Sequence, residues 1–330
     1  MGNQLIAIGE ALIDFIPNNI GCDFDEITEF APKIGGAPAN VCGAFSKLGG
    51  SSCMLTQLGD DLFGHKILRG LKAHGINTDY ISLTDTANTA LAFVSLDKKG
   101  GRKFSFYRKP SADMLYSSEK VREEYFDDVY ALHFCSISLG DFPMKDAHVR
   151  AIELARKRGG LISFDPNLRF QLWDNRSLLK TTVLEFLPLA DVVKISDEEL
   201  EFITGETELQ KALPKLFVGN VKLVLYTCGG EGAYAVNGKT SVFAPSSKVE
   251  VFDTTGAGDG FIGSFLWKMH QLGITSDRLS EMTSDQLAEC LTFSHRFCGI
   301  SVTKLGAIDS YPDAAAMNVR PISKTSSDNG

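Results

Sequence analysis

The amino-acid sequence predicts an α/β fold, with a doubly wound, mostly parallel β-sheet and a small β-sheet lid. Short apolar runs alternate with amphipathic stretches along most of the 330 residues, which is the pattern of successive βαβ units. Two regions, about 16–34 and 88–108, break this rhythm because they are extended and carry no helical period. We therefore expect a single domain over residues 1–330, with a lid formed by these two regions.

The first half of the chain predicts two βα units and a hairpin. An apolar run over 5–9 is typical of a buried strand, and a Gly-Gly turn then opens a helix over 38–48. A strand over 53–58 and a helix over 62–74 follow. Apolar and polar residues alternate on both sides of the turn at 97–102, which predicts a β-hairpin there.

The second half continues the alternation and ends in a polar tail. Apolar runs predict further strands over 129–137, 161–165, 190–195 and 221–227. Amphipathic stretches predict helices over 144–158 and 177–187. Asn237 and Gly238 lie between two runs of alternating apolar and polar residues, which predicts a hairpin turn. A phosphate-binding Walker loop is disfavoured here, because Ala233 stands where that motif requires Gly. The tail over 320–330 is polar, and we expect it to be disordered.

The composition argues against several classes of protein. Lys and Arg number 33 against 41 Asp and Glu, so the net charge of −8 lacks the basic footprint of a nucleic-acid binder. No apolar run approaches the roughly 20 residues that cross a bilayer, and the N-terminus lacks the basic segment of a signal peptide. The seven cysteines are irregularly spaced, which is typical of reduced thiols. We expect a cytoplasmic protein with no nucleic-acid or membrane partner.

The segment Asp253-Thr-Thr-Gly-Ala-Gly-Asp259 carries the strongest chemical signal, because it turns from a strand into an apolar helix. The first N–H groups of a helix have no internal partners and attract anions. The amides of Gly256, Ala257 and Gly258 can therefore hold an anionic group in transfer while Asp259 accepts a hydroxyl proton. The alternative is an aspartate that only stabilises the helix start. A dinucleotide fingerprint at 258–263 is disfavoured, since no second strand ending in an acid follows.

Other polar residues follow the predicted strands. Gly35 and Gly36 let a small polar ligand approach the backbone and Asn40 can bind its hydroxyls, although a tight strand–helix turn also explains them. Asp14 comes directly after the first strand, and polar segments follow later strands at 165–169, 194–199 and 227–232. Because the carboxyl ends of parallel strands meet along one edge of a sheet, we expect these residues to share one site.

These motifs resemble the ribokinase-type (PfkB) carbohydrate kinase family over about residues 4–315. The segment 35–41, Gly-Gly-Ala-Pro-Ala-Asn-Val, is similar to the family's first signature, and 253–259 is similar to its second. Within the family the chain is most similar to fructokinases, in the segments 9–14, 58–64, 106–108 and 164–169 with the following Leu172-Trp173.

The resemblance implies transfer of a phosphoryl group from ATP to D-fructose, which gives D-fructose 6-phosphate. It implies that Asp259 is the base and that Gly256 to Gly258 form the anion hole, with Mg²⁺ and K⁺ as further cofactors. A 2-keto-3-deoxygluconate kinase or another sugar kinase of the family is the alternative. A kinase-like binding protein without catalysis is disfavoured because Asp259, Gly256 and Gly258 are all present.

The resemblance also implies roles for other residues. The expected sugar contacts are Asp14, Gly35, Gly36, Asn40, Arg108, Asn167 and Arg169. The expected nucleotide contacts are Lys194, Ser196, Thr227, Gly229, Gly232 and His295. Glu199 organises Mg²⁺ through water, although Ser196 stands where the family usually has Asn. The expected positions around the monovalent cation are Asp253, Thr255, Ser301, Lys304, Gly306 and Ser310. We further expect a homodimer that forms through the β-lid.

Overall fold

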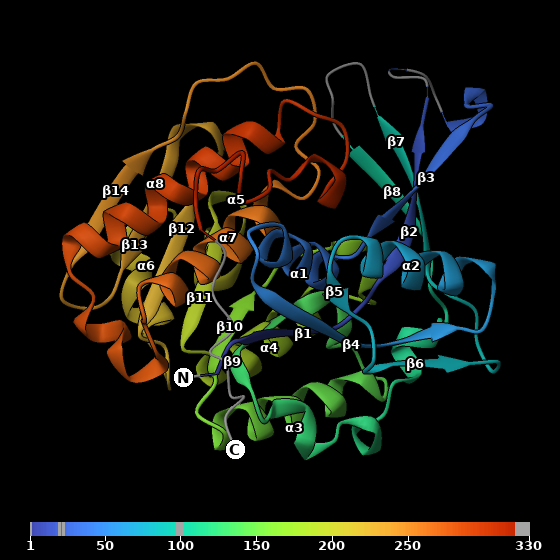
Figure 1. Ribbon diagram of the computed structural model, residues 1–330, viewed down its shortest axis with the longest axis horizontal. Coiled ribbons are helices and arrows are strands. Elements are labelled where there is room, and N and C mark those ends of the chain that lie inside the picture. Colours follow the sequence, from blue (N-terminus) through green and yellow to red (C-terminus); the bar gives the residue numbers. More distant parts are fainter. Residues whose placement is uncertain (1, 19–20, 22–23, 97–101, 321–330) are drawn as a thin grey trace.

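The computed structural model describes residues 2–18, 21, 24–96 and 102–320, and within them two β-sheets form, the larger with helices on both faces (Figure 1). The strands of the larger sheet have the order β14-β13-β12-β11-β10-β9-β1-β4-β5, and β6 pairs with β4. The predicted doubly wound, mostly parallel sheet is confirmed. Most of the turn expected at 97–102 and nearly all of the tail expected at 320–330 lie outside the described residues.

The strands of the larger sheet are parallel except at one edge. The main parallel strands are β1 Gln4–Ile8, β4 Ser51–Gly59, β9 Val129–Cys135, β10 Leu161–Asp165, β11 Val192–Ser196 and β12 Leu223–Thr227. Two short strands, β5 Ile76–Asn77 and β6 Ile81–Thr84, extend the sheet beside β4. The antiparallel edge consists of β13 Gly232–Val236 and β14 Ser241–Pro245.

The hairpin between β13 and β14 is confirmed, but its turn lies one residue later than predicted. The N–H of Asn237 donates to the carbonyl of Thr240 at 3.1 Å, so Gly238 and Lys239 are the central residues. Gly238 has a φ of 77°, which a glycine adopts easily at the first position of such a turn. The side chain of Asn237 faces inward and donates to two carbonyls, which explains why it does not occupy the turn itself.

Alternate residues of β1 face opposite helix layers, as the two-residue period of a strand requires. Leu5 and Ala7 pack into one apolar cluster, and Ile6 and Ile8 pack into the other. The first layer contains α1 Ala37–Lys47, α2 Leu62–Ala73, α7 Ala257–Gln271 and α8 Ser284–Ser301. The second contains α3 Met144–Lys157, α4 Arg176–Phe186, α5 Asp197–Thr204 and α6 Leu209–Leu216. The sequence did not predict α5, α6 and α8 individually.

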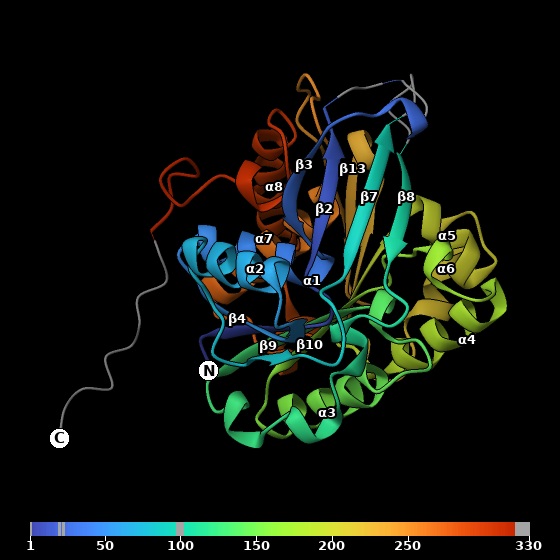
Figure 2. The same ribbon diagram turned by 90° about the vertical axis from the view of Figure 1, so that its right-hand side faces the viewer.

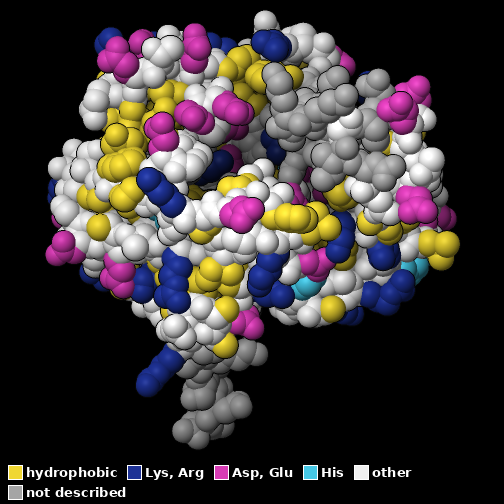
Figure 3. Space-filling view, turned by 90° about the horizontal axis from the view of Figure 1, so that it is seen from above, with side chains coloured by type: hydrophobic (Ala, Val, Ile, Leu, Met, Phe, Trp, Pro, Cys, Tyr) yellow, Lys and Arg dark blue, Asp and Glu magenta, His cyan; other side chains and the backbone are white. Residues whose placement is uncertain are grey.

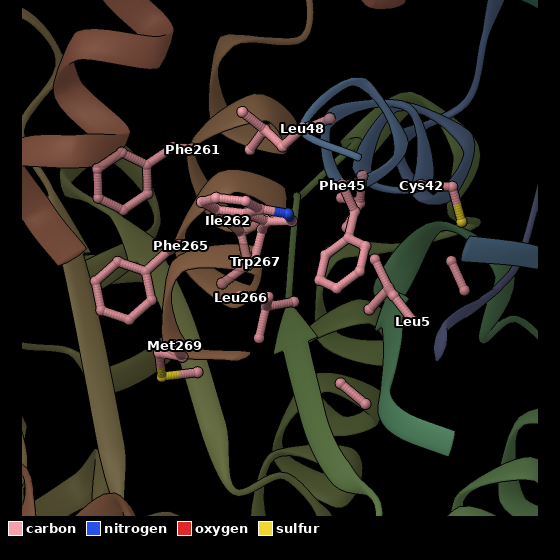
Figure 4. Packing of buried hydrophobic residues seen from close by; sticks show 14 of the residues in the cluster. Leu5, Cys42, Phe45, Leu48, Phe261, Ile262, Phe265, Leu266, Trp267 and Met269 are labelled. Atoms are coloured by element: carbon pink, nitrogen blue, oxygen red, sulfur yellow. The ribbon is translucent and has the colours of Figure 1, made fainter. Parts of the chain in front are cut away.

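Helices α1 and α7 pack closely in the middle of the first layer (Figure 4). Phe45 of α1 and Trp267 of α7 are fully buried in this cluster. A Cβ atom on Gly263 would lie 2.8 Å from the Cβ of Ala44 and 2.8 Å from the carbonyl oxygen of Val41. The close approach of the two helices therefore requires glycine at this position.

The smaller sheet rises beside α1 and α2 as a separate layer (Figure 2). It consists of β2 Leu12–Pro17, β3 Phe30–Gly35, β7 Leu91–Leu96 and β8 Arg102–Tyr107, in the order β3-β2-β7-β8. Asp14 lies inside β2 and does not end the first strand, which corrects the prediction that it follows that strand directly. The reason is that the chain leaves β1 at Ile8 and enters the smaller sheet at Leu12. Within the described ranges, no helix has both the length and the apolar composition that crossing a bilayer requires.

Candidate active site

Two cavities lie at the carboxyl ends of the parallel strands, where the strand order reverses. The strand β1 lies between β4 and β9, so the connections leave it in both directions and open a crevice there. From above, the molecule is hollowed near its centre (Figure 3). The smaller cavity has a volume of about 200 Å³ and contains Asp259 in its wall. The larger has a volume of about 570 Å³ and extends toward α8.

Asp259 stands in the first turn of α7 and is 8% exposed. Asn40 of α1 donates its side-chain amide to Asp259 Oδ2 at 2.8 Å, and Asn167 donates to Oδ1 at 3.2 Å. Burial raises the pKa of the Asp259 carboxyl, while the two amides and the charges of Arg169 and Lys194 oppose this rise. The carboxylate is thus fixed in place and made a stronger proton acceptor than an exposed aspartate.

The turn before α7 places the backbone amides of Gly256 and Gly258 next to Asp259, whereas the N–H of Ala257 donates to the carbonyl of Thr254 at 3.1 Å. Gly256 has a φ of 71°, in the left-handed region, and caps the helix. A Cβ there would lie 2.6 Å from the Cβ of Ala307 and 2.7 Å from the hydroxyl of Tyr311. That hydroxyl donates to the carbonyl of Gly256 at 2.6 Å. The helix start at Gly256, Ala257 and Gly258 therefore has the geometry of an anion site, and only glycine fits its first position.

Lys194 lies between the two cavities and lines both. Its Nζ is 3.0 Å from Asp165 Oδ2, and both side chains are buried. Burial opposes the charged form of Lys194, but the neighbouring carboxylates, Asp165 first among them, outweigh it and raise its pKa. A Cβ on Gly258 would lie 3.3 Å from this Nζ. A permanent positive charge thus faces the anion site.

The structure brings most of the expected sugar contacts to the smaller cavity. Its wall includes the expected residues Asp14, Gly36, Asn40, Asn167 and Arg169. Gly35 lies behind them, where a Cβ would overlap the carboxylate of Asp14. Further wall residues, to which the sequence analysis assigned no role in the site, are Glu10, Leu12, Phe104, Phe106 and Ile137. Glu10 could have been predicted as a site residue from the sequence. It comes directly after a buried strand, which is the signal that identified the segments 165–169, 194–199 and 227–232.

Arg108 is not brought to this cavity. It is buried, and its guanidinium donates to Asp113, to the carbonyl of Ile137 at 3.1 Å and to Ser138 Oγ at 2.9 Å. The hydroxyl of Ser138 in turn donates to Glu10 Oε2 at 2.7 Å. Arg108 lines a neighbouring cavity of about 520 Å³ instead. Its donors hold the loop that orients Glu10, so a direct sugar contact is not what this geometry favours.

All six expected nucleotide residues line the larger cavity. They are Lys194, Ser196, Thr227, Gly229, Gly232 and His295. Apolar side chains that the sequence did not single out complete one wall, namely Val249, Val251, Phe261 and Val302. An apolar slot that ends in a turn of exposed amides suits a flat heterocycle attached to an anionic chain.

Glu199 has a structural role that the sequence did not predict. Its Oε2 accepts from the N–H of Ser196 at 2.9 Å, which closes a capping box at the start of α5. Its Oε1 accepts from the N–H of Leu168 at 2.8 Å. Among the described residues, no three His, Cys, Asp or Glu side chains gather in a metal-binding cluster. Glu199 thus fits a role toward Mg²⁺ only through water and phosphate.

The residues expected around a monovalent cation do converge. Asp253 Oδ1 accepts from the N–H of Thr255 at 2.9 Å, and Oδ2 accepts from the N–H of Gly306 at 2.9 Å. The hydroxyls of Ser301 and Ser310 are 2.7 Å apart. Lys304 joins this loop through its backbone, whose N–H donates to the carbonyl of Ser301 at 3.0 Å. The loop 301–310 therefore packs directly behind the anion turn.

Known proteins match this chain along nearly its full length. A family model described as pfkB family carbohydrate kinase matches residues 3–314. Fructokinase-1 of Zea mays is 41% identical over 318 residues, which cover 95% of this chain and 96% of the relative.

Solved structures agree with the sequence comparison. The structure of fructokinase with bound ATP from Xylella fastidiosa has a TM-score of 0.89 and 32% identity, with 96% of this chain and 98% of that chain covered. A fructokinase double mutant from Vibrio cholerae O395, in a form with bound fructose, ADP and potassium ion, has a TM-score of 0.83 and 29% identity, with the same coverage of both chains. The chain described here belongs to the pfkB family of carbohydrate kinases.

Proposed function

We propose that this chain is an ATP-dependent fructokinase, which converts D-fructose to D-fructose 6-phosphate. The observation that carries the proposal is Asp259, which Asn40 and Asn167 hold in the wall of the smaller cavity. It lies next to Ala257 and Gly258 of the anion turn, which line both cavities. The similarity to fructokinases supports fructose as the acceptor and ATP as the donor.

In this mechanism the sugar occupies the smaller cavity and ATP the larger. Asp259 accepts the proton of the sugar hydroxyl, whose oxygen forms the new bond to the γ-phosphorus as the bond to the β-phosphate oxygen breaks. The amides of Gly256 to Gly258 hold the oxygens of the group in transfer, and Lys194 offsets their charge. Phosphoryl transfer depends mainly on such positioning and charge stabilisation. ADP leaves with the bridging oxygen, and the small sheet covers the sugar as a lid.

Mg²⁺ and K⁺ are proposed as cofactors in two different places. Mg²⁺ would accompany the ATP phosphates, with Glu199 acting through water, and would neutralise phosphate charge. K⁺ would lie in the loop formed by Asp253, Thr255 and residues 301–310. A relative that binds potassium ion supports this assignment, and so does the convergence of Asp253, Gly306 and Ser310 behind the anion turn.

The K⁺ assignment is tested by comparing rates in potassium chloride and in tetramethylammonium chloride at matched ionic strength. A cation in this loop would offset carbonyl dipoles and stiffen the anion turn, so we expect faster turnover in K⁺. Equal rates in the two salts would remove the K⁺ site from the proposal and leave the sugar and ATP assignments untouched.

The choice of sugar is tested by a coupled ADP-release assay with fructose, ketodeoxygluconate, ribose, glucose, tagatose and adenosine. Fructose is expected to give the highest kcat/KM. A 2-keto-3-deoxygluconate kinase is the second candidate, because Arg169 lies in the wall of the smaller cavity and could meet a sugar carboxylate. A higher kcat/KM for ketodeoxygluconate would assign the chain to that activity instead.

We propose that the protein forms a homodimer through the lid. On the face of the small sheet opposite Asp14, Phe15 stacks on Phe93 with ring centroids 4.6 Å apart, and Phe93 contacts Tyr107 at 5.4 Å. Tyr107 is 63% exposed, so it carries this row of aromatic rings out to the surface of the lid. Sedimentation should give the mass of a dimer for the wild type and of a monomer for Tyr107→Asp. Phe243→Asp, at the far edge of the larger sheet, serves as the control, and a monomeric wild type would refute the dimer.

A cytoplasmic location is also proposed. The six cysteines in the described part of the chain are all free, which suits a reducing compartment. Fractionation of the source cells, with the protein detected by antibody, tests this location.

A further inference from the structure

A third cavity, of about 450 Å³, lies on the other side of the 301–310 loop from the anion turn. Three separate parts of the fold form its walls. They are β3 through Pro32, Lys33 and Ile34, helix α2 through Lys66, Arg69 and Gly70 together with its C-cap His74, and the loop 306–309. This cavity has no wall residue in common with the two cavities at Asp259.

The cavity carries an excess of positive charge. Lys33, Lys66 and Arg69 are cationic, and Asp309 is the carboxylate among the wall residues. Asp309 is already engaged, since Lys33 Nζ lies 2.9 Å from its Oδ2 and His74 Nε2 lies 3.2 Å from its Oδ1. Lys66 and Arg69 reach no acidic side chain of the described residues. Basic side chains are visible where α2 forms the lower right of Figure 3.

The protonation state of His74 fits this charge balance. Burial lowers the pKa of its imidazole, and the neighbouring Lys47 lowers it further, while Asp309 opposes them. A neutral imidazole near pH 7 leaves three cations against one carboxylate, which is an excess of two positive charges. That excess matches a phosphate monoester, which carries about −1.5 to −2 charges at pH 7.

The cavity is mechanically close to the catalytic turn. Gly306 donates its N–H to Asp253 at 2.9 Å, and Ala307 packs against Gly256 so closely that no Cβ fits between them. The residues Gly306 and Ala307 also form part of the cavity wall. A ligand that shifts Gly306 or Ala307 would therefore also shift the backbone of the anion turn, because these residues contact it directly.

We propose that this cavity binds a small phosphate-bearing metabolite at Lys66 and Arg69, and that the bound ligand changes the turnover rate through the loop 306–309. The planar fork of an arginine beside a lysine is suited to the oxygens of a phosphate. A volume of about 450 Å³ is within the usual range of small-ligand pockets, so a sugar phosphate fits as well as inorganic phosphate. Binding of the ligand to this cavity does not depend on the proposed function. The effect on the turnover rate does depend on it, because it requires kinase activity.

Calorimetric titration tests the binding part. The probes are inorganic phosphate and fructose 6-phosphate, with fructose as the uncharged control. The protein is first saturated with fructose and a non-hydrolysable ATP analogue, so that the anion turn is occupied and no turnover contributes heat. Binding by both phosphates would place the recognition in the phosphate group itself, and binding by the ester alone would identify a sugar phosphate as the ligand.

The double variant Lys66→Gln/Arg69→Gln removes both cations, while Lys72→Gln alters an exposed lysine of the same helix outside the cavity. Because each charge-assisted hydrogen bond contributes substantially, Kd should rise at least about tenfold in the double variant and stay within about twofold in Lys72→Gln. Unchanged melting temperatures would show that both variants fold. No heat in the wild type, or equal Kd in both variants, overturns the site.

Initial rates test the coupling. Added inorganic phosphate also competes with ATP at the anion turn, and this part of its effect should be the same in all three proteins. Any change in rate that persists at saturating ATP is a change in kcat. This change should be present in the wild type and Lys72→Gln and absent in the double variant. Binding without such a change in kcat overturns the coupling through the loop while leaving the site in place. Loss of all kinase activity in the wild type would instead contradict the proposed function, which the calorimetry does not depend on.

Discussion

At the scale of single residues, burial makes Asp259 a stronger proton acceptor, and two amide donors hold its carboxylate oxygens in place. Asp259→Asn keeps the size of the side chain but removes the basic oxygen. We expect kcat to fall by at least about 10², the lower end of general-base catalysis, with little change in KM. Asp285→Asn, in the first turn of α8, makes the same change at another helix start and should leave kcat unaltered. A folded Asp259→Asn protein with more than about a tenth of the wild-type kcat would show that the base is elsewhere.

The raised pKa of Asp259 sets the direction of the pH dependence. A base acts when deprotonated, so activity should be lost as pH falls through the pKa of this carboxyl. Because burial raises that pKa above the ordinary aspartate value of 3.8, the acidic limb of log kcat/KM against pH should lie above 3.8. An acidic limb at or below the value of an exposed aspartate would contradict the role of burial.

Lys194 should contribute charge stabilisation in the transition state. Lys194→Met is expected to lower kcat by about 10²–10³, as the loss of one such donor does, and Lys194→Arg should keep part of the rate. Loss of the positive charge should also move the acidic limb of Asp259 to higher pH, since Lys194 lowers that pKa.

The Lys194 variant needs a second change to separate catalysis from stability. Removal of the lysine leaves Asp165 buried without its partner, which is destabilising. Lys194→Met/Asp165→Asn should regain melting temperature without regaining kcat. If kcat recovers together with stability, Lys194 serves only to pair with Asp165.

Single residues also show where sequence reasoning succeeds and where it ends. Asp259, Asn40 and Asn167 could be predicted as neighbours because each follows a strand or opens a helix at the same sheet edge. Arg108 could not be placed correctly, because its partners Asp113 and Ser138 compete for its donors and nothing in the local pattern reveals them.

At the scale of elements, the contact between α1 and α7 sets the geometry of the base. Asn40 belongs to α1 and Asp259 to α7, so the distance between these helices determines their 2.8 Å hydrogen bond. Gly263→Ala would force the helices apart at Ala44 and Val41. We expect a loss of about 1–3 kcal/mol in the free energy of unfolding, together with a lower kcat.

A second substitution checks this explanation. Ala44→Gly removes one of the two nearest atoms that the new Cβ would meet, so Gly263→Ala/Ala44→Gly should recover part of both losses. Gln271→Ala, at the exposed end of α7, is the control and should change neither. A Gly263→Ala protein of lower stability but unaltered kcat would mean that the helix spacing is not transmitted to Asp259.

Elements were predicted best where periodicity and a stop signal agree. Helix α2 extends from Leu62 to Ala73, close to the prediction, because Gly75 follows an amphipathic run. Asp14 was misplaced because the step from the larger sheet into β2 has no turn signal in the sequence. Helix α8 has a capping box formed by Thr283 and Gln286, which was available in the sequence and was not used.

At the scale of the whole molecule, the alternation of strands and helices was enough to predict the doubly wound sheet. Contacts between distant segments were not predictable in the same way. Lys33, His74 and Asp309 meet beside the third cavity, although they come from a strand, a helix and a loop far apart in the chain. Local periodicity constrains which face of an element is buried, but not which surface charges from different elements become neighbours.

The division of the crevice into two cavities has a consequence for the order in which substrates bind and products dissociate. Only Lys194, Thr254, Ala257 and Gly258, among the described residues, line both cavities. Neither cavity uses the ligand of the other as part of its wall. Each substrate can therefore bind, and each product can dissociate, whether or not the other cavity is occupied. We expect random-order kinetics, in which initial-rate lines intersect and ADP competes with ATP but not with the sugar. Strictly ordered product inhibition would mean that one ligand must first complete the other's compartment.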